Sequence, residues 1–160
     1  MDTTDIIREA RAKGLTLATA ESCTAGMITA ALTDVAGSSA VVDRGYVTYS
    51  NRAKQEMLGV EQATLEAVGA VSEEVALEMA EGAQTRANVD IAVAVTGIAG
   101  PGGSEHKPEG RVCFALARRN QPTHVETVDF GPLGRDGVRT ATRDHALTLI
   151  WQSLTANPQG

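Results

Sequence analysis

Apolar positions follow two different periodicities along the chain, and these predict alternating helices and strands. Between residues 24 and 35 they recur at helical spacing, at Met27, Ile28, Ala31, Leu32 and Val35. Residues 91–95 are instead a continuous apolar run, which is typical of a strand covered on both faces. In the same way we predict helices at residues 3–13, 24–35, 52–58, 62–68, 73–86 and 135–154, with Asn51 and Ser72 as N-caps. Strands are predicted at residues 15–21, 41–49, 91–95, 112–117 and 123–130.

The order of these elements predicts an α/β fold, a three-layer α/β/α sandwich with a mixed, mostly parallel sheet. The last two strands are separated by a short turn, so we expect them to form an antiparallel hairpin at one side of the sheet. A chain of 160 residues fits one domain, and we interpret residues 1–160 as a single domain. Ligands of such sheets bind beyond the carboxyl ends of the strands, where residues 21–26, 49–54 and 96–110 are expected to lie.

Composition narrows the classes of function. The net charge of −6 argues against a nucleic-acid-binding surface, which needs clustered Lys and Arg. We find no signal-peptide pattern and no run of 18 apolar residues, so we expect no membrane partner and a cytoplasmic location. Cys23 and Cys113 are far apart in the sequence and are interpreted as buried, reduced thiols. We also expect a homo-oligomer, although no sequence pattern gives the oligomeric state.

One candidate nucleophile is the hydroxyl of Ser22, at the corner between the strand at 15–21 and the next helix. On this stretch alone a helix-capping hydroxyl is the better interpretation, because Ser is common at such turns. The backbone N–H groups that begin the helix, around Cys23 and Thr24, could however receive an oxyanion, which is the main need of acyl-transfer chemistry.

A nucleophilic serine needs a base, and the sequence offers two kinds. Of the histidines, His145 is interpreted as a core residue, His124 as a surface residue, and His106 as a loop residue without an obvious Asp partner, so a Ser-His-Asp triad is weakly supported. Lys54 would occupy the third position of its helix, where the helix dipole disfavours an ammonium and lowers its pKa. A neutral lysine is a competent base, but a lysine on the protein surface explains the same spacing equally well. Tyr49, just before that corner, could relay a proton or simply pack on its strand.

A glycine-rich loop follows the strand at 91–95. Its backbone N–H groups could bind a phosphate or carboxylate, and the candidate binding residues are Thr96, Gly97, Ile98, Ala99, Gly100, Gly102 and Gly103. Lys107 could add a positive charge. Arg135, Arg139 and Arg143 form a stripe that is typical of a solvated helix face, although one of them could reach a phosphate. No His or Cys pair has metal-ligand spacing, so we expect no metal and no other cofactor.

Four blocks of the sequence together resemble one known family. Residues 20–24, residues 44–51 with Lys54, residues 69–72, and residues 96–101 with Lys107 and Pro108 are similar to the CinA carboxy-terminal domain family. These proteins are the nicotinamide-nucleotide amidohydrolases, also known as competence/damage-inducible proteins. The resemblance covers about residues 5–155. The chain departs from the family pattern at Ala25 and Glu109, where the family often has Gly and Val, and its glycine loop is about one residue shorter.

The resemblance implies a specific reaction, in which the carboxamide of nicotinamide mononucleotide is hydrolysed to nicotinate mononucleotide and ammonia during pyridine-nucleotide recycling. It implies Ser22 as nucleophile, Lys54 as base and Tyr49 as the assisting residue. It implies that N–H groups at Cys23 and Thr24 stabilise the oxyanion and that the loop at 96–103 holds the ribose phosphate, without a metal. Two alternatives stay open: a nucleotide-binding or protein-interaction module without turnover, and a hydrolase that uses Ser22 on another amide.

Overall fold

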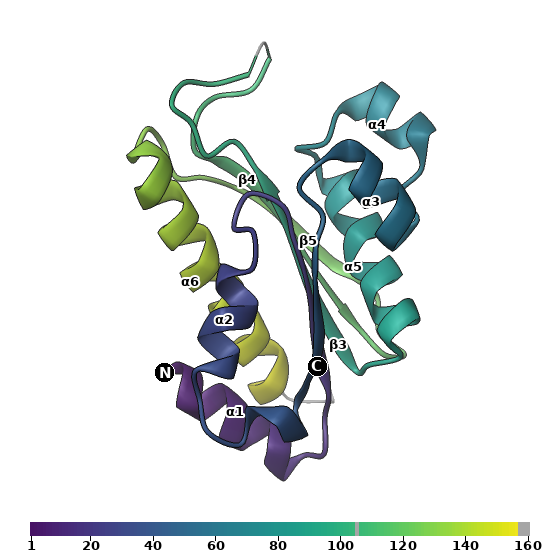
Figure 1. Cartoon of the computed structure of the whole chain (residues 1–160), viewed down its shortest axis with the longest axis vertical. Coiled ribbons are helices and arrows are strands. Elements are labelled where there is room, and N and C mark those ends of the chain that lie inside the picture. Colours follow the sequence, from purple (N-terminus) through teal and green to yellow (C-terminus); the bar gives the residue numbers. More distant parts are fainter. Residues whose placement is uncertain (105, 157–160) are drawn as a thin grey trace.

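The computed structural model describes residues 1–104 and 106–156, which form one five-stranded sheet with helices on both faces (Figure 1). The strands lie in the order β2-β1-β3-β4-β5. Their bounds are β1 (Leu17–Glu21), β2 (Val42–Val47), β3 (Ile91–Gly97), β4 (Arg111–Arg118) and β5 (His124–Asp129). β1 pairs in parallel with both β2 and β3, whereas β4 is antiparallel to β3 and to β5. The predicted mixed sheet with an antiparallel hairpin at one side is therefore confirmed.

The helices form the two outer layers of the sandwich (Figure 1). On one face lie α1 (Thr3–Ala12), α2 (Met27–Thr33) and α6 (Gly134–Thr155), and on the other α3 (Asn51–Leu58), α4 (Gln62–Val68) and α5 (Glu73–Ala87). A short 3-10 helix, η1 (Ser38–Ala40), precedes β2. The core under α5 is rich in alanine from both the strands and the helix, so α5 packs close to the sheet: Ala18, Ala20, Ala92, Ala94, Ala76, Ala80 and Ala83 are all buried there.

Strand alternation determines which way the site residues face. In β1, Ala18 and Ala20 belong to the core under α5, while Leu17 belongs to the core under α1, α2 and α6. The Glu21 side chain contacts α2, so the next residue, Ser22, projects toward the layer of α3 and α5. Because β1, β2 and β3 are parallel, the loops after them meet at one edge of the sheet, as predicted.

At this edge, α2 and α3 begin at other residues than predicted. α2 begins at Met27 rather than at residue 24, because Ala25 and Gly26 have φ angles of 47° and 102°. These positive values form a turn and do not fit an α-helix. α3 is capped one residue early: the Ser50 hydroxyl accepts from the Ala53 N–H at 3.0 Å, and Asn51 is the first helical residue. Lys54 is therefore the fourth residue of α3, not the third.

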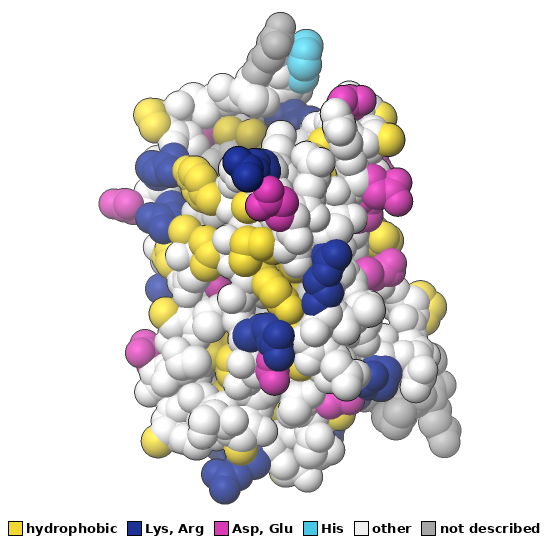
Figure 2. Space-filling view, turned by 45° about the vertical axis from the view of Figure 1, so that its right-hand side comes forward, with side chains coloured by type: hydrophobic (Ala, Val, Ile, Leu, Met, Phe, Trp, Pro, Cys, Tyr) yellow, Lys and Arg dark blue, Asp and Glu magenta, His cyan; other side chains and the backbone are white. Residues whose placement is uncertain are grey.

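On the face shown in Figure 2, Lys and Arg side chains are scattered among acidic and hydrophobic ones and form no continuous basic patch. Among the helices in the described ranges, none combines the length and the apolar character that a membrane span requires.

Candidate active site

Ser22 and Lys54 are in contact at the carboxyl edge of the sheet. Lys54 Nζ lies 2.9 Å from Ser22 Oγ, although the residues are 32 positions apart in the sequence. Ser22 comes from the end of β1 and Lys54 from the first turns of α3, which covers the same face. Both are buried, with exposed fractions of 8% and 1%. The structure thus places the candidate nucleophile and the candidate base in contact.

The surroundings of Lys54 favour its neutral form. Besides Ser22, its Nζ contacts the main-chain carbonyls of Thr48 and Tyr49, at 3.0 Å and 3.2 Å. Within the described residues no carboxylate forms an ion pair with it, and burial lowers the pKa of Lys54 from 10.5 to about 8. A neutral amine has two N–H donors and one lone pair. If the donors serve the two carbonyls, the lone pair faces the Ser22 hydroxyl, which is the arrangement that a general base requires.

Ser22 lies in a row of three hydroxyl side chains across neighbouring strand ends. The register of β1 with β2 and β3 aligns Ala20 with Tyr46 and Ala94, so two residues later Thr48, Ser22 and Thr96 lie side by side on one face. Thr96 Oγ1 donates to the Ala70 carbonyl at 2.9 Å. The buried Thr48 Oγ1 has no hydrogen-bond partner in the part of the chain that the structure describes. An unpaired buried hydroxyl beside Ser22 is an exception to the rule that buried polar groups are hydrogen-bonded.

Glu21, the residue before Ser22, is completely buried and organises the corner from the opposite face. One carboxylate oxygen accepts from Thr24 Oγ1 at 2.6 Å and from the Ile28 N–H at 2.9 Å. The other accepts from the N–H and hydroxyl of Thr29, at 3.0 Å and 2.9 Å. Glu21 therefore satisfies the first N–H groups of α2, which prefer a negative charge. Since these N–H groups are occupied, α2 itself cannot supply an oxyanion hole.

The available N–H groups belong instead to the turn between Ser22 and α2. Ser22 N–H donates to the Val95 carbonyl and Ala25 N–H to the Ser22 carbonyl, at 3.2 Å and 3.1 Å. The N–H groups of Cys23 and Thr24 have no acceptor among the described residues. The two residues predicted for the oxyanion thus carry unoccupied donors next to Ser22, although in a turn and not in a helix.

Tyr49 contacts Lys54 through its backbone and not through its hydroxyl. The side chain is 59% exposed, and its hydroxyl accepts from Arg135 Nη2 at 2.9 Å. Arg135 also donates to the Gly100 carbonyl at 2.8 Å and so links Tyr49 to the glycine loop. The hydroxyl is thus engaged by an arginine of α6, and its part in proton transfer stays a prediction.

The glycine loop follows β3, as predicted, and some of its N–H groups are already bonded within the protein. Thr96 and Gly97 are the last residues of β3, and the Ile98 N–H donates to the Arg111 carbonyl at 2.9 Å. Among the described loop residues, Ala99, Gly100 and Gly103 have N–H groups without an acceptor, whereas Gly102 donates to Glu109 at 2.5 Å. Residue 105 of the loop is outside the described ranges.

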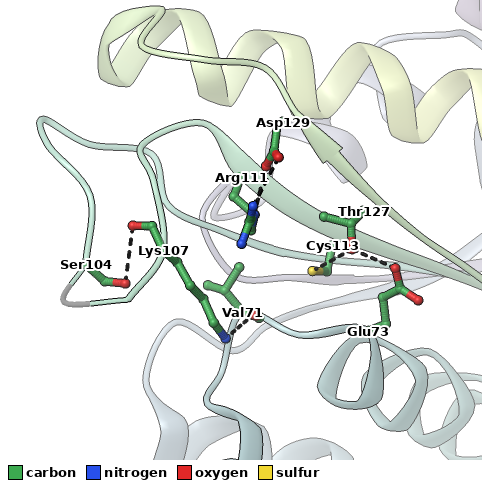
Figure 3. Close-up of polar contacts among 8 residues, drawn as sticks. All are labelled: Val71, Glu73, Ser104, Lys107, Arg111, Cys113, Thr127 and Asp129. Atoms are coloured by element: carbon green, nitrogen blue, oxygen red, sulfur yellow. Dashed lines mark hydrogen bonds and ion pairs between the residues drawn. The ribbon is translucent and has the colours of Figure 1, made fainter.

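Lys107 does not extend toward a ligand. Its ammonium donates to the backbone carbonyls of Val68, at 2.7 Å, and Val71. Figure 3 shows the side chain reaching from the loop to Val71. Lys107 therefore links the glycine loop to the end of α4 and to the segment before α5. Its ammonium, which could have contacted a phosphate, makes a structural contact instead.

His145, His124 and both cysteines lie outside the contact between Ser22 and Lys54. His145 Nε2 lies 2.6 Å from Glu126, and its ring packs against those of Phe114 and Phe130. His124 also lies next to Glu126, at 3.5 Å. Both cysteines are free and buried, as predicted, and burial raises the pKa of the Cys23 thiol to about 11. Cys113 contacts Thr127, which donates to Glu73 (Figure 3).

Three residues of this site were missed by the sequence analysis: Glu21, Thr48 and Arg139. A charged residue that ends an apolar strand just before a helix is a usable signal for Glu21, since helix N-termini attract carboxylates. The position of Thr48 beside Ser22 depends on the register of β2 with β1, which the sequence alone does not give. Arg139 was interpreted within a solvated stripe, but its Nε donates to the Cys23 carbonyl at 3.0 Å. No local pattern distinguishes it from Arg143, which contacts only its neighbour Asp144.

Comparison with known proteins points to one family. The family model of the CinA C-terminal domain matches residues 3–154. The nicotinamide-nucleotide amidohydrolase PncC of Escherichia coli K12 is 49% identical over 148 residues, which are 92% of this chain and 89% of that protein. A CinA-like protein of Geobacter sulfurreducens is 53% identical over 152 residues, which are 94% of this chain but 36% of that protein. The crystal structure of competence/damage inducible protein CihA from Agrobacterium tumefaciens superposes with a TM-score of 0.88 and 48% identity, covering 96% of both chains.

Proposed function

The chain belongs to the CinA C-terminal domain family, and from this premise we propose that it hydrolyses the carboxamide of nicotinamide mononucleotide to nicotinate mononucleotide and ammonia. The relatives named nicotinamide-nucleotide amidohydrolase align with almost the whole chain, and this alignment supports the substrate. The observation that carries the chemistry is the 2.9 Å contact between Lys54 Nζ and Ser22 Oγ.

The first half of the proposed reaction is acylation of Ser22. Neutral Lys54 takes the hydroxyl proton while Oγ attacks the carboxamide carbon, and the carbonyl oxygen becomes an oxyanion facing the N–H groups of Cys23 and Thr24. The Lys54 ammonium then gives its proton to the amide nitrogen. The C–N bond breaks, ammonia leaves, and a nicotinoyl ester of Ser22 remains.

The second half is hydrolysis of that ester. Lys54, neutral again, takes a proton from water, and the hydroxide oxygen attacks the ester carbon. The tetrahedral intermediate collapses, Ser22 Oγ leaves and recovers its proton from Lys54, and the carboxylic acid is released and loses its proton to water as nicotinate. No step in this cycle uses a group from outside the chain except water.

The remaining predicted residues complete the binding site in this proposal. The unoccupied N–H groups of Ala99, Gly100 and Gly103 receive the ribose phosphate. Because the Tyr49 hydroxyl is held by Arg135, we place its role in substrate contact at the mouth of the site. A cytoplasmic location and a homo-oligomer belong to the same proposal. Two free thiols fit a reducing compartment, and the oligomeric state is measurable by light scattering.

The test is ammonia release from nicotinamide mononucleotide by the purified chain and by three variants. We expect turnover by the wild type, and loss of at least about a thousandfold in Ser22→Ala and Lys54→Met. Arg52→Met is the matched control, because Arg52 lies on the same helix but is exposed and pairs with Glu56. It should retain full activity.

The alternatives predict different results. A binding module would retain the nucleotide without releasing ammonia above the Ser22→Ala background. A hydrolase of another amide would release ammonia from simple carboxamides such as nicotinamide but not from the nucleotide. If Lys54→Met were active at neutral pH, the proposed amidase activity would be retained but the serine–lysine mechanism would be overturned.

A further inference from the structure

Arg139 holds the turn that follows Ser22. It projects from α6 and is half-buried, and its Nε donates to the Cys23 carbonyl at 3.0 Å. Its Nη2 lies 3.5 Å from the next carbonyl, that of Thr24. No carboxylate in the described ranges lies within ion-pair distance of this guanidinium. Both of its contacts are therefore to the main chain of two successive residues.

The contact with the Cys23 carbonyl also determines where the following N–H points. The peptide bond between Cys23 and Thr24 is trans, so its C=O and N–H are directed to opposite sides. The carbonyl faces the guanidinium, which comes from α6. The Thr24 N–H therefore points away from α6, toward the layer on the other side of the sheet. That layer contains Lys54, and Ser22 Oγ faces it.

This N–H is one of the unoccupied donors described above. If the peptide turned over, the Cys23 carbonyl would replace the N–H on the Ser22 side, and its oxygen would repel an oxyanion. Turns permit such reorientation, because only two dihedral angles have to change. Glu21 fixes the Thr24 side chain at 2.6 Å, but it does not contact this peptide.

From these contacts we infer that Arg139 is a positioning residue for the reaction: it holds the Cys23–Thr24 peptide so that the Thr24 N–H faces the oxyanion formed on Ser22. The inference depends on the proposed amidase function, since it concerns the intermediate of that reaction. Arginine suits this role because its planar guanidinium can present two N–H groups to two adjacent carbonyls at once. A lysine at this position could serve only one carbonyl with similar geometry.

The experiment is steady-state kinetics with nicotinamide mononucleotide on wild type, Arg139→Met, Arg139→Lys and Arg143→Met. Removing one oxyanion donor lowers kcat by about a hundredfold to a thousandfold. We expect a loss of that size for Arg139→Met with KM changed by less than about threefold, because the N–H acts on the intermediate and not on the bound amide. Arg139→Lys should fall between it and the wild type. Arg143→Met is the matched control one turn along α6, and it should be unchanged.

A second readout separates positioning from stability. Guanidinium ion added to Arg139→Ala should raise kcat in a saturable way, whereas Ser22→Ala should not respond. The inference would be overturned if the wild type is active and Arg139→Met has the same kcat. It would also be overturned if kcat falls and KM rises by the same factor in Arg139→Met and guanidinium ion does not rescue Arg139→Ala. If Arg139→Met does not fold, full kcat in Arg139→Lys overturns the inference, and a reduced kcat with unchanged KM supports it. A wild type that releases no ammonia would instead refute the proposed function.

Discussion

Lys54 Nζ lies 2.9 Å from Ser22 Oγ and shares no ion pair with a carboxylate in the described residues. A buried ammonium without a counter-ion is unfavourable, so the proton on Lys54 is held weakly. The same burial that lowers its pKa makes it useful as a base near neutral pH. Two measurable consequences follow, one for activity and one for stability.

The first prediction concerns the pH profile of activity. Because burial lowers the pKa of Lys54 to about 8, only about a tenth of the molecules have the neutral base at pH 7. The value of kcat/KM should rise about tenfold per pH unit up to pH 8 and then level off. Measurements should start above pH 6.5, where the substrate phosphate is already ionised. A flat profile between pH 6.5 and 8 would exclude Lys54 as the titrating base.

The second prediction concerns stability against pH. Between pH 8 and 10.5 the unfolded chain keeps a proton on Lys54 that the folded chain has lost, so raising the pH favours the folded state. The free energy of unfolding of the wild type should therefore increase by about 3 kcal/mol relative to Lys54→Met across this window. Urea denaturation of both proteins at pH 7.5, 9 and 10.5 tests this, because the variant cancels the other titrating groups. A constant difference would mean that Lys54 has an ordinary pKa in the folded protein.

The sequence predicted the fold well because its strongest signals are local. Helical spacing and continuous apolar runs located the described helices and strands, and the only notable shifts are at the ends of elements. The start of α2 was wrong by three residues, because the turn at Ala25 and Gly26 depends on the buried Glu21 carboxylate, which no local pattern reveals.

For the site, the sequence could identify individual candidate residues but not the contacts between them. Ser22 and Lys54 were both candidates from the sequence, but their contact depends on α3 folding back over the end of β1. Lys107 could, from the sequence, add a positive charge to the loop, but its ammonium donates to the main-chain carbonyls of Val68 and Val71. Contacts to backbone atoms leave no signature in the residue types that accept them.

The third prediction concerns Gly45, which lies on β2 beside the Glu21 network. A Cβ at this position would lie 2.2 Å from Thr29 Oγ1 and 2.8 Å from Thr19 Oγ1. Gly45→Ala should displace Thr29, whose N–H and hydroxyl both donate to Glu21, and destabilise the protein by about 1–3 kcal/mol. Thermal denaturation of the single variants and of Gly45→Ala/Thr29→Ala measures the coupling. Additive losses in the double variant would contradict the steric explanation.

The fourth prediction concerns Ala25, a residue other than glycine with a positive φ in the turn after Ser22. Its φ of 47° is left-handed, which costs an L-residue with a Cβ about 1–2 kcal/mol. Ala25→Gly would remove this cost, but the larger backbone entropy of glycine in the unfolded chain offsets part of the gain in stability. The variant should therefore stabilise the protein by about 0.5–1 kcal/mol. The matched control is Ala12→Gly at the end of α1, which should destabilise it by a similar amount. Loss of stability in both variants would show that Ala25 is not strained.

The fifth prediction concerns the hydroxyl of Tyr49. Lys54 contacts only the main-chain carbonyl of this residue, and Tyr49→Phe leaves that contact intact. The hydroxyl accepts from Arg135, which also holds the Gly100 carbonyl, so its removal should loosen the mouth of the site. We therefore expect KM for nicotinamide mononucleotide to rise by about threefold to tenfold, with kcat reduced by less than about threefold.

Arg135→Met provides the control for this explanation, because Tyr49 and Arg135 would then act as one unit. The double variant should be little worse than the more severe of the two single variants, since each removes the same contact. A fall in kcat of a hundredfold or more in Tyr49→Phe, with KM unchanged, would contradict this expectation. It would return the hydroxyl to proton transfer beside Ser22, and the contact with Arg135 would then have to open before each turnover.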